Sequence, residues 1–135
     1  MAASTRRAPP ALAIESAAPP FAALHRAVHA IQQAVHESDL DVTHAEAVVL
    51  ALLAHTGQAT MGEIHCGFGF RKSTVTNVID RLVDRKLAER HADPSDGRSW
   101  LVRLTPAGVA TSRRVLKIFR DVELRVAHIL AGDDS

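Results

Sequence analysis

The sequence contains no tyrosine and a single tryptophan, and aromatic residues make up only 4% of its 135 residues. A core must therefore be built mainly from Ala, Val, Leu and Ile, since hydrophobic residues still reach 47%. The only cysteine, Cys66, excludes an intramolecular disulfide and suits a reducing cytosol, so we expect a cytoplasmic protein. No apolar run approaches the roughly 18 residues that a membrane span needs. The length favours one domain.

The net charge of +1 conceals an uneven distribution along the chain. Residues 1–70 carry 3 basic and 6 acidic side chains, whereas residues 71–103 carry 8 basic and 5 acidic ones. A local excess of positive charge suits a polyanionic partner such as nucleic acid. Residues 1–20 are rich in Ala and Pro and are interrupted by Glu15, so we interpret them as a disordered tail and not as a targeting peptide.

Hydrophobic periodicity and capping patterns predict three helices before the basic region. Apolar residues recur at spacings of 3 and 4 over residues 21–37, which is close to a coiled-coil seam and predicts a partner helix. The sequence THAE (residues 43–46) is a capping-box pattern before a nearly all-apolar helix, and Gly57 is placed to end it. A second capping box, TMGE (residues 60–63), predicts a short helix that ends at Cys66 or Phe68.

A further helix, a hairpin and a long helix are predicted after residue 71. Residues 87–91 and 99–104 read as two short strands that are joined by the turn sequence DPSDG. Thr105 is then an N-cap for a helix to about Leu130. The helix from Lys72 to Lys86 is amphipathic, with Val75, Val78, Ile79, Leu82 and Val83 on its inner face.

The order of these elements predicts a mainly α fold with a small β-hairpin wing. A short helix, a Gly-containing turn and an amphipathic helix form a helix-turn-helix. The hairpin that follows directly forms the wing. The turn residues Asp96, Gly97 and Arg98 lie at its tip, where they support no core.

The segment ATMGEIHCGFGFRKSTVTNVIDRLVDRKLAERHADPSDGRSWLVRLTPAG resembles the winged-helix core of the MarR family of bacterial transcriptional regulators. Its most specific parts are STVTNVIDRLVDRKLAER, and DPSDGRS followed closely by LTPAG. The resemblance implies one domain over residues 21–131, with a winged helix-turn-helix core at 43–104. Helices at 21–37 and 105–131 would form the dimer, and residues 132–135 would be a tail.

The resemblance also implies a homodimer on a pseudo-palindromic double-stranded DNA operator, and most often a repressor. The helix from Lys72 would enter the major groove. The wing would reach the minor groove through Arg98, which Asp96 braces. Short polar side chains at the start of a helix can reach base edges, and arginine or lysine neutralises phosphates. The candidate DNA-binding residues are Arg71, Lys72, Ser73, Thr74, Thr76, Asn77, Arg81, Asp96 and Arg98.

Several positions depart from the family pattern. Arg71 stands where a small polar cap is usual, so we expect capping to shift to Ser73. Asn77 and Ser95 stand where the family often has arginine, which reduces the number of phosphate contacts. The family usually carries a further helix after the long one, whereas this chain reads AGDDS there, so we expect the two flanking helices to form the dimer.

Other possible functions are suggested by fewer residues. The family often binds small aromatic or phenolic effectors, and the sequence does not identify one. His25, His29 and His36 form a stripe that suits either zinc or a solvated helix face, and we predict no metal site and no cofactor. Cys66 is either a redox sensor or a quiet surface thiol. An interaction module with weak DNA binding is the alternative function. An enzyme is not expected, since no catalytic motif is found.

Overall fold

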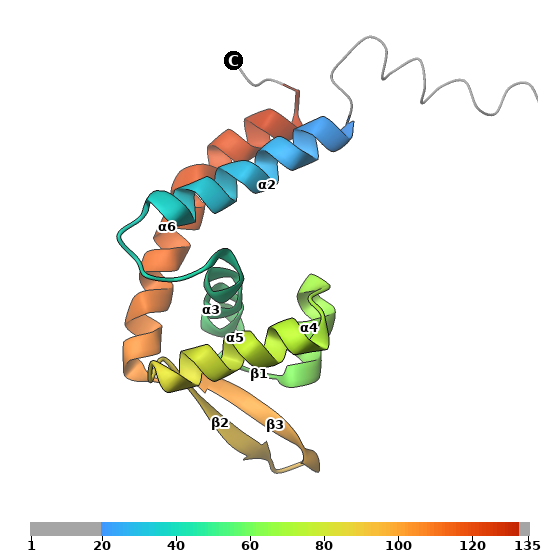
Figure 1. Ribbon diagram of the computed structural model, residues 1–135, viewed down its shortest axis with the longest axis vertical. Helices are drawn as coiled ribbons and strands as arrows, with labels where there is room; N and C mark the ends of the chain where they lie inside the picture. Colours follow the sequence, from blue (N-terminus) through green and yellow to red (C-terminus); the bar gives the residue numbers. More distant parts are fainter. Residues whose placement is uncertain (1–19, 133–135) are drawn as a thin grey trace, which may run out of the picture. The chain divides into compact units, whose positions relative to one another are not determined.

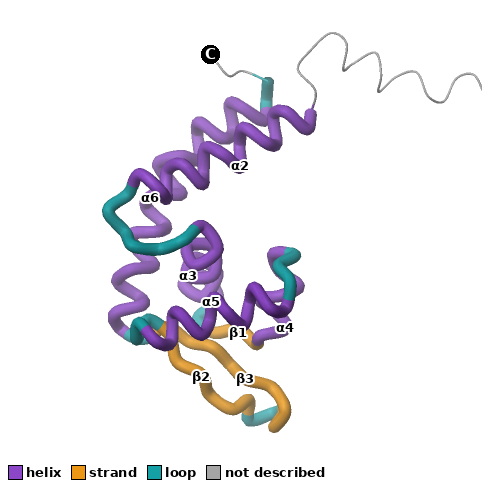
Figure 2. The backbone as a smooth tube through the Cα atoms, viewed as in Figure 1, coloured by secondary structure: helices purple, strands orange, loops and turns teal. Residues whose placement is uncertain are grey.

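The computed structural model describes residues 20–132, which form five helices and a three-stranded antiparallel sheet (Figures 1 and 2). The mainly α fold with a hairpin wing is thereby confirmed. Apart from Pro20 and Gly132, the predicted tails at 1–20 and 132–135 lie outside the described residues. The elements are α2 (Pro20–Glu37), α3 (His44–Thr56), β1 (Gln58–Thr60), α4 (Met61–Phe68), α5 (Lys72–Asp84), β2 (Ala88–Asp93), β3 (Asp96–Leu104) and α6 (Pro106–Leu130).

The described residues fall into two compact units. One unit spans Val35–Ile118 and holds α3, α4, α5, the sheet and the start of α6. The other combines α2 up to Ala34 with α6 from Phe119. A single domain over residues 21–131 stays a prediction. Among the described residues, no helix is both long and apolar enough to cross a membrane.

The larger unit is built around an aliphatic core. Each of its helices and its central strand contributes side chains that are almost wholly buried. Four of the five predicted inner-face residues of α5 are among them, and Val83 is half-buried. Such interdigitated aliphatic side chains are the main favourable contribution to folding. The core consists of Val49, Leu50, Leu53, Ile64, Val75, Val78, Ile79, Leu82, Val102 and Val115.

Local capping explains where the helices of this unit begin and end. Both predicted capping boxes are present: Thr43 and Glu46 exchange bonds of 3.1 Å, and Thr60 and Glu63 exchange bonds of 2.8 and 3.0 Å. The C-terminus of α5 is a Schellman motif, with Lys86 at a positive φ of 62°. Each pattern satisfies backbone groups that a helix end leaves unpaired.

The sheet has the strand order β1-β3-β2, so the long strand β3 is central. Val102 of β3 lies opposite Ala59 of β1 and Arg90 of β2. The sequence predicted β2 and β3, although both are longer than expected, and it missed β1. Strand β1 has three residues, of which only Ala59 is buried. Such a short segment shows no alternating pattern that would identify a strand.

The smaller unit is a pair of helices that pack through small residues. Ala27 and Ala30 of α2 are buried against Val122 and Ile129 of α6. The start of the apolar seam predicted over residues 21–37 is not covered within one chain: exposure is 73% for Phe21, 57% for Leu24 and 47% for Val28. The partner helix for this part of the seam stays a prediction.

Candidate nucleic-acid interface

The outer face of α5 carries the polar side chains that the sequence predicted for base contacts. Ser73, Thr76 and Asn77 are exposed, and Thr74 is half-buried. Spacings of three and four residues place the first three on one helix face. The buried valines on the opposite face fix this orientation, so the polar face points away from the core.

The start of α5 differs from the expectation for its cap. The helix begins at Lys72, and Arg71 is the N-cap residue, with an extended backbone and no side-chain hydrogen bond to the helix. The expected shift of capping to Ser73 is therefore wrong. Arg71 and Lys72 are both exposed, so two cations stand at the first turn of α5. Cations there are unfavourable for the helix dipole but available to a polyanion.

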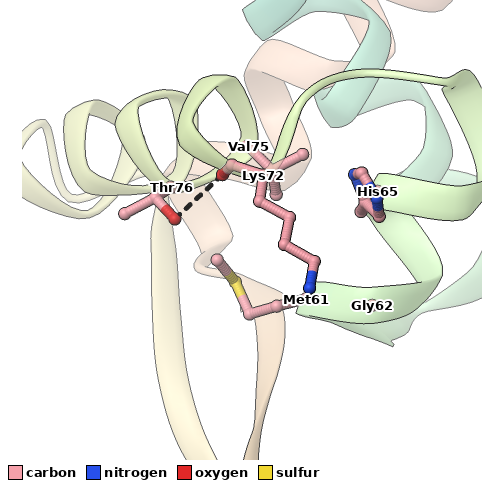
Figure 3. Close-up of a pocket in the computed structure, with 6 residues that line it drawn as sticks. All are labelled: Met61, Gly62, His65, Lys72, Val75 and Thr76. Carbon is pink, nitrogen blue, oxygen red and sulfur yellow. Dashed lines mark hydrogen bonds between the residues drawn. The ribbon is translucent and has the colours of Figure 1, made fainter.

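A hollow of about 280 Å³ lies between the first turns of α4 and α5 (Figure 3). The Lys72 side chain extends across it toward Met61, and His65 lies on the α4 side (Figure 3). The Thr76 hydroxyl donates to the carbonyl of Lys72 at 3.0 Å, so its oxygen remains free to accept. Two of the predicted DNA-contact residues therefore border an open hollow on the surface.

Glu46 connects the start of α3 to the second half of α5. Its carboxylate accepts a bond of 2.6 Å from Nε of Arg81 and a longer one of 3.4 Å from Arg85. Glu46 is buried, whereas the Arg81 side chain is half exposed. Arg81 therefore has a structural partner inside the chain, and its contact with phosphate stays a prediction.

The tip of the wing is organised by two aspartates. Asp93 accepts from the amide and the hydroxyl of Ser95, and the Ser95 hydroxyl bond is the main cause of a lowered pKa of Asp93. Asp96 accepts from the amide of Arg98 and the hydroxyl of Ser99, both at 3.1 Å. Asp96 thus braces the turn through the backbone of Arg98. The Arg98 guanidinium is exposed and has no ion pair among the described residues.

An ion pair that the sequence did not predict attaches the wing to α5. The guanidinium of Arg90 on β2 bonds the carboxylate of Asp80 on α5. Alternation along β2 could have placed Arg90 on the strand face toward the core, because Ala88 is buried on that face. The pair neutralises one acid on the outer face of α5 and fixes the direction in which the hairpin leaves it.

The corner between α5, β2 and α6 is tied together by Thr105. Its amide donates to the carbonyl of Leu87, and its hydroxyl donates to the carbonyl of Lys86 at 2.7 Å. The same hydroxyl oxygen accepts from the amide of Gly108 at 3.0 Å. This corner positions the base of the wing against the C-terminal end of α5.

The histidines and the cysteine form no evident site. The rings of His25 and His29 are stacked, with centroids 6.3 Å apart. Within residues 20–132, no three His, Cys, Asp or Glu side chains are grouped so that they could hold a metal ion. Cys66 is exposed on α4. Burial lowers the pKa of His44, at the first position of α3, below its usual 6.5.

The structure thus brings most of the predicted residues onto two neighbouring elements, α5 and the wing. Arg71, Lys72, Ser73, Thr76 and Asn77 are exposed on or beside α5. Asp96 and Arg98 are exposed at the tip of the hairpin. The other two predicted residues also lie on α5: Thr74 is half-buried, and Arg81 is engaged by Glu46.

Comparison with known proteins agrees with this arrangement. The family model described as "MarR family" matches residues 40–99. The HTH-type transcriptional repressor NicR of Pseudomonas putida is 27% identical over 96 residues, which are 70% of this chain and 61% of NicR. The repressor IacR of Pseudomonas putida is 27% identical over 54% of its length. The chain thus matches about half to three fifths of these curated relatives.

Solved structures show the same fold. BpsR of Bordetella bronchiseptica, whose DNA binding is regulated by 6-hydroxynicotinic acid, is 31% identical over 78% of this chain and 79% of its own, with a TM-score of 0.67. A mutant of E. coli MarR complexed with operator DNA is 26% identical over 87% of this chain and 86% of its own, with a TM-score of 0.70. The relatives named here are transcriptional regulators and not enzymes. With its winged helix-turn-helix and these likenesses, the chain belongs to the MarR family.

Proposed function

We propose that this protein is a dimeric DNA-binding transcriptional regulator that acts as a repressor on a pseudo-palindromic operator. The observation that carries the proposal is the combination of an exposed polar face on α5 with an exposed Arg98 that has no ion pair within residues 20–132, at the tip of an adjacent wing. Neither group supports the core, and both suit DNA. A helix of this kind fits the major groove, and an arginine at a hairpin tip is favoured by the negative potential of a narrow minor groove.

Dimerisation is part of the proposal because α2 exposes a row of large apolar side chains. Phe21, Leu24 and Val28 follow one another at spacings of three and four, as on the face of a paired helix. Leu124 and Leu130 of α6 are exposed as well, at 67% and 51%. Exposed large apolar side chains in a row are typical of an interface, and we propose that a second copy of the chain covers them.

We extend the proposal to a small aromatic effector that regulates DNA binding. The BpsR structure is described for regulation of DNA binding by 6-hydroxynicotinic acid, a small aromatic acid. A ligand of that chemical class would act here by favouring one spacing of the two recognition helices over another. Its effect on operator affinity would equal the ratio of its affinities for the free and DNA-bound states of the protein.

The test is fluorescence anisotropy of the purified protein with the DNA upstream of its own gene and with scrambled DNA. We expect tighter binding to the native fragment and a loss of affinity between about 0.05 M and 0.15 M salt, since phosphate contacts release counterions. Equal, weak binding to both fragments would count against a regulator of its own gene.

The alternative function is a winged-helix interaction module with weak DNA binding. It is favoured by the ion pair that occupies Arg81 and by the presence of Asn77 and Ser95 where arginine is frequent in the family. Arg98→Ala separates the two. If the protein is a sequence-specific DNA-binding regulator, Arg98→Ala should weaken DNA binding by about 1–3 kcal/mol, as for the loss of a groove contact. Arg113→Ala, in an exposed residue of α6, is the charge-matched control.

A further inference from the structure

The wing exposes a large aromatic side chain that none of the contacts described above uses. Trp100 on β3 is 52% exposed, and it is the only tryptophan of the chain. Aromatic side chains are among the largest contributors to cores and interfaces, because each can bury 150–250 Å². A tryptophan left half uncovered on a hairpin is therefore available to a partner outside the chain.

The register of the sheet fixes the face on which Trp100 lies. Val102 is fully buried, and the residue opposite it on β2 is Arg90, which bonds Asp80 of α5. Side chains two residues apart on a strand share a face. Trp100 therefore lies on the face that Val102 and Arg90 turn toward α5, one step nearer the tip.

Strand β1 ends at Thr60, opposite Leu101, so only β2 has a residue opposite Trp100. The residue opposite Trp100 is Ala92, which is itself exposed and offers only a methyl group. Figure 1 shows β2 and β3 running together away from α5. The exposed Arg98 follows two residues closer to the tip.

We propose that Trp100 is a DNA-contact residue that packs against the sugar–phosphate backbone between the groove read by α5 and the groove reached by Arg98. This inference rests on the proposed function. Its ring would cover a deoxyribose, and its Nε1–H, which is a donor only, would donate to a phosphate oxygen. The charge of the two elements is complementary to DNA, since Arg98, two residues from Trp100 on β3, and Arg71 and Lys72 at the start of α5 are exposed cations.

A single tryptophan lets intrinsic fluorescence report on this one position in the unmodified full chain. The probe is a random-sequence duplex of about 30 base pairs, long enough for two half-sites one helical turn apart, at about 0.05 M salt. Acrylamide quenching of Trp100 is measured with and without saturating duplex, while anisotropy of a labelled duplex reports binding. We expect the duplex to shield Trp100 and the quenching constant to fall.

Two variants then separate packing from hydrogen bonding. We expect Trp100→Ala to weaken duplex binding about five- to tenfold and Trp100→Phe to weaken it less, because phenylalanine keeps the ring but loses the donor. Thermal unfolding of both variants establishes that the hairpin still folds. The quenching measurement uses the wild-type chain and so does not depend on them.

The outcomes are distinct. Shielding of Trp100 together with weaker binding of Trp100→Ala supports the inference. Binding of the duplex by anisotropy with unchanged quenching and an unchanged affinity of Trp100→Ala overturns it and leaves the proposed function standing, with Trp100 free for a protein partner. Absence of binding to any duplex overturns both.

Discussion

Nε of Arg81 lies 2.6 Å from Oε2 of Glu46, so α5 is bonded directly to the glutamate of the capping box that begins α3. The Glu46 carboxylate is buried and also accepts from the amide of Thr43. One side chain therefore completes a capping box and holds α5 at once. A charge that is removed from water in this way is stable only while its partners remain in place.

We expect Arg81→Ala to lower the free energy of unfolding by about 1–2 kcal/mol, because the buried carboxylate loses its shortest charged partner. The value stays below that for a fully buried pair, since Arg81 is half exposed and screened by solvent. Urea unfolding measures it, and a cycle with Glu46→Gln isolates the pair. Arg120→Ala, an exposed residue of α6, is the control.

The same variant tests the phosphate contact predicted for Arg81. If Glu46 holds Arg81 in the complex, the dependence of affinity on salt should be the same in Arg81→Ala and in the wild type. Lys72→Ala should reduce that slope by about one. A similar reduction in Arg81→Ala would place its guanidinium on a phosphate after all.

Gly108 permits the close approach of α6 to the corner before the wing. A Cβ atom at this position would lie 1.9 Å from the carbonyl oxygen of Leu87, which is backbone and already accepts from the amide of Thr105. We expect Gly108→Ala to destabilise the fold by about 2–3 kcal/mol, because the helix or the corner must shift. Thermal unfolding measures the effect.

Gly67→Ala is the matched control for Gly108→Ala. Gly67 lies in α4, and an added Cβ would meet nothing within 4 Å. Alanine has a higher helix propensity than glycine, so this variant should be more stable by about 0.5–1 kcal/mol. Equal effects at the two positions would show that the close approach to Leu87 is not what constrains residue 108.

The half-buried position of His44 makes the stability of the fold depend on pH. Burial lowers its pKa below 6.5, so between the folded and unfolded pKa values the unfolded chain binds more protons. The contribution of neutral His44 to the free energy of unfolding is therefore complete above pH 6.5. It falls as the pH drops from 6.5 through the lower folded pKa. Nδ1 of His44 is also buried without a hydrogen-bond partner among the described residues.

We expect His44→Gln to lose less stability than the wild type when urea unfolding is repeated at about pH 7.5 and pH 5.5. All other titrating groups are shared, so the difference between the two proteins isolates His44. His55→Gln, in the exposed last turn of the same helix, should behave like the wild type. An identical loss in all three proteins would contradict the assignment.

Features encoded within a few residues were predictable, and long-range pairings were not. The capping boxes at Thr43 and Thr60 follow from four consecutive residues, and the structure confirms both. The bond from Arg81 to Glu46 joins residues 35 positions apart, and no local pattern encodes it. The expected cap at Ser73 was wrong because Arg71 already adopts the extended N-cap backbone.

Packing between helices was predicted only in part, since periodicity shows which faces are apolar but not which partner covers them. On α6, the expected apolar side of Val115, Ile118, Val122 and Ile129 is buried at three positions, whereas Ile118 is half-buried. On α2 the small residues Ala27 and Ala30 are used, because alanine lets two helices approach closely. The larger residues Phe21, Leu24 and Val28 of α2 stay exposed. The predicted DNA contacts are not tested by the fold and stay predictions.

The exposed row on α2 leads to a prediction about assembly. We expect light scattering at micromolar concentration to give a mass twice the 14.5 kDa of one chain. Leu24→Asp with Val28→Asp should yield a monomer, because two charges would be desolvated at the interface. Duplex affinity should fall with it, since two half-sites are no longer bound together. Val109→Asp changes an exposed apolar residue of the larger unit and should remain a dimer. A wild-type monomer would contradict the α2 interface.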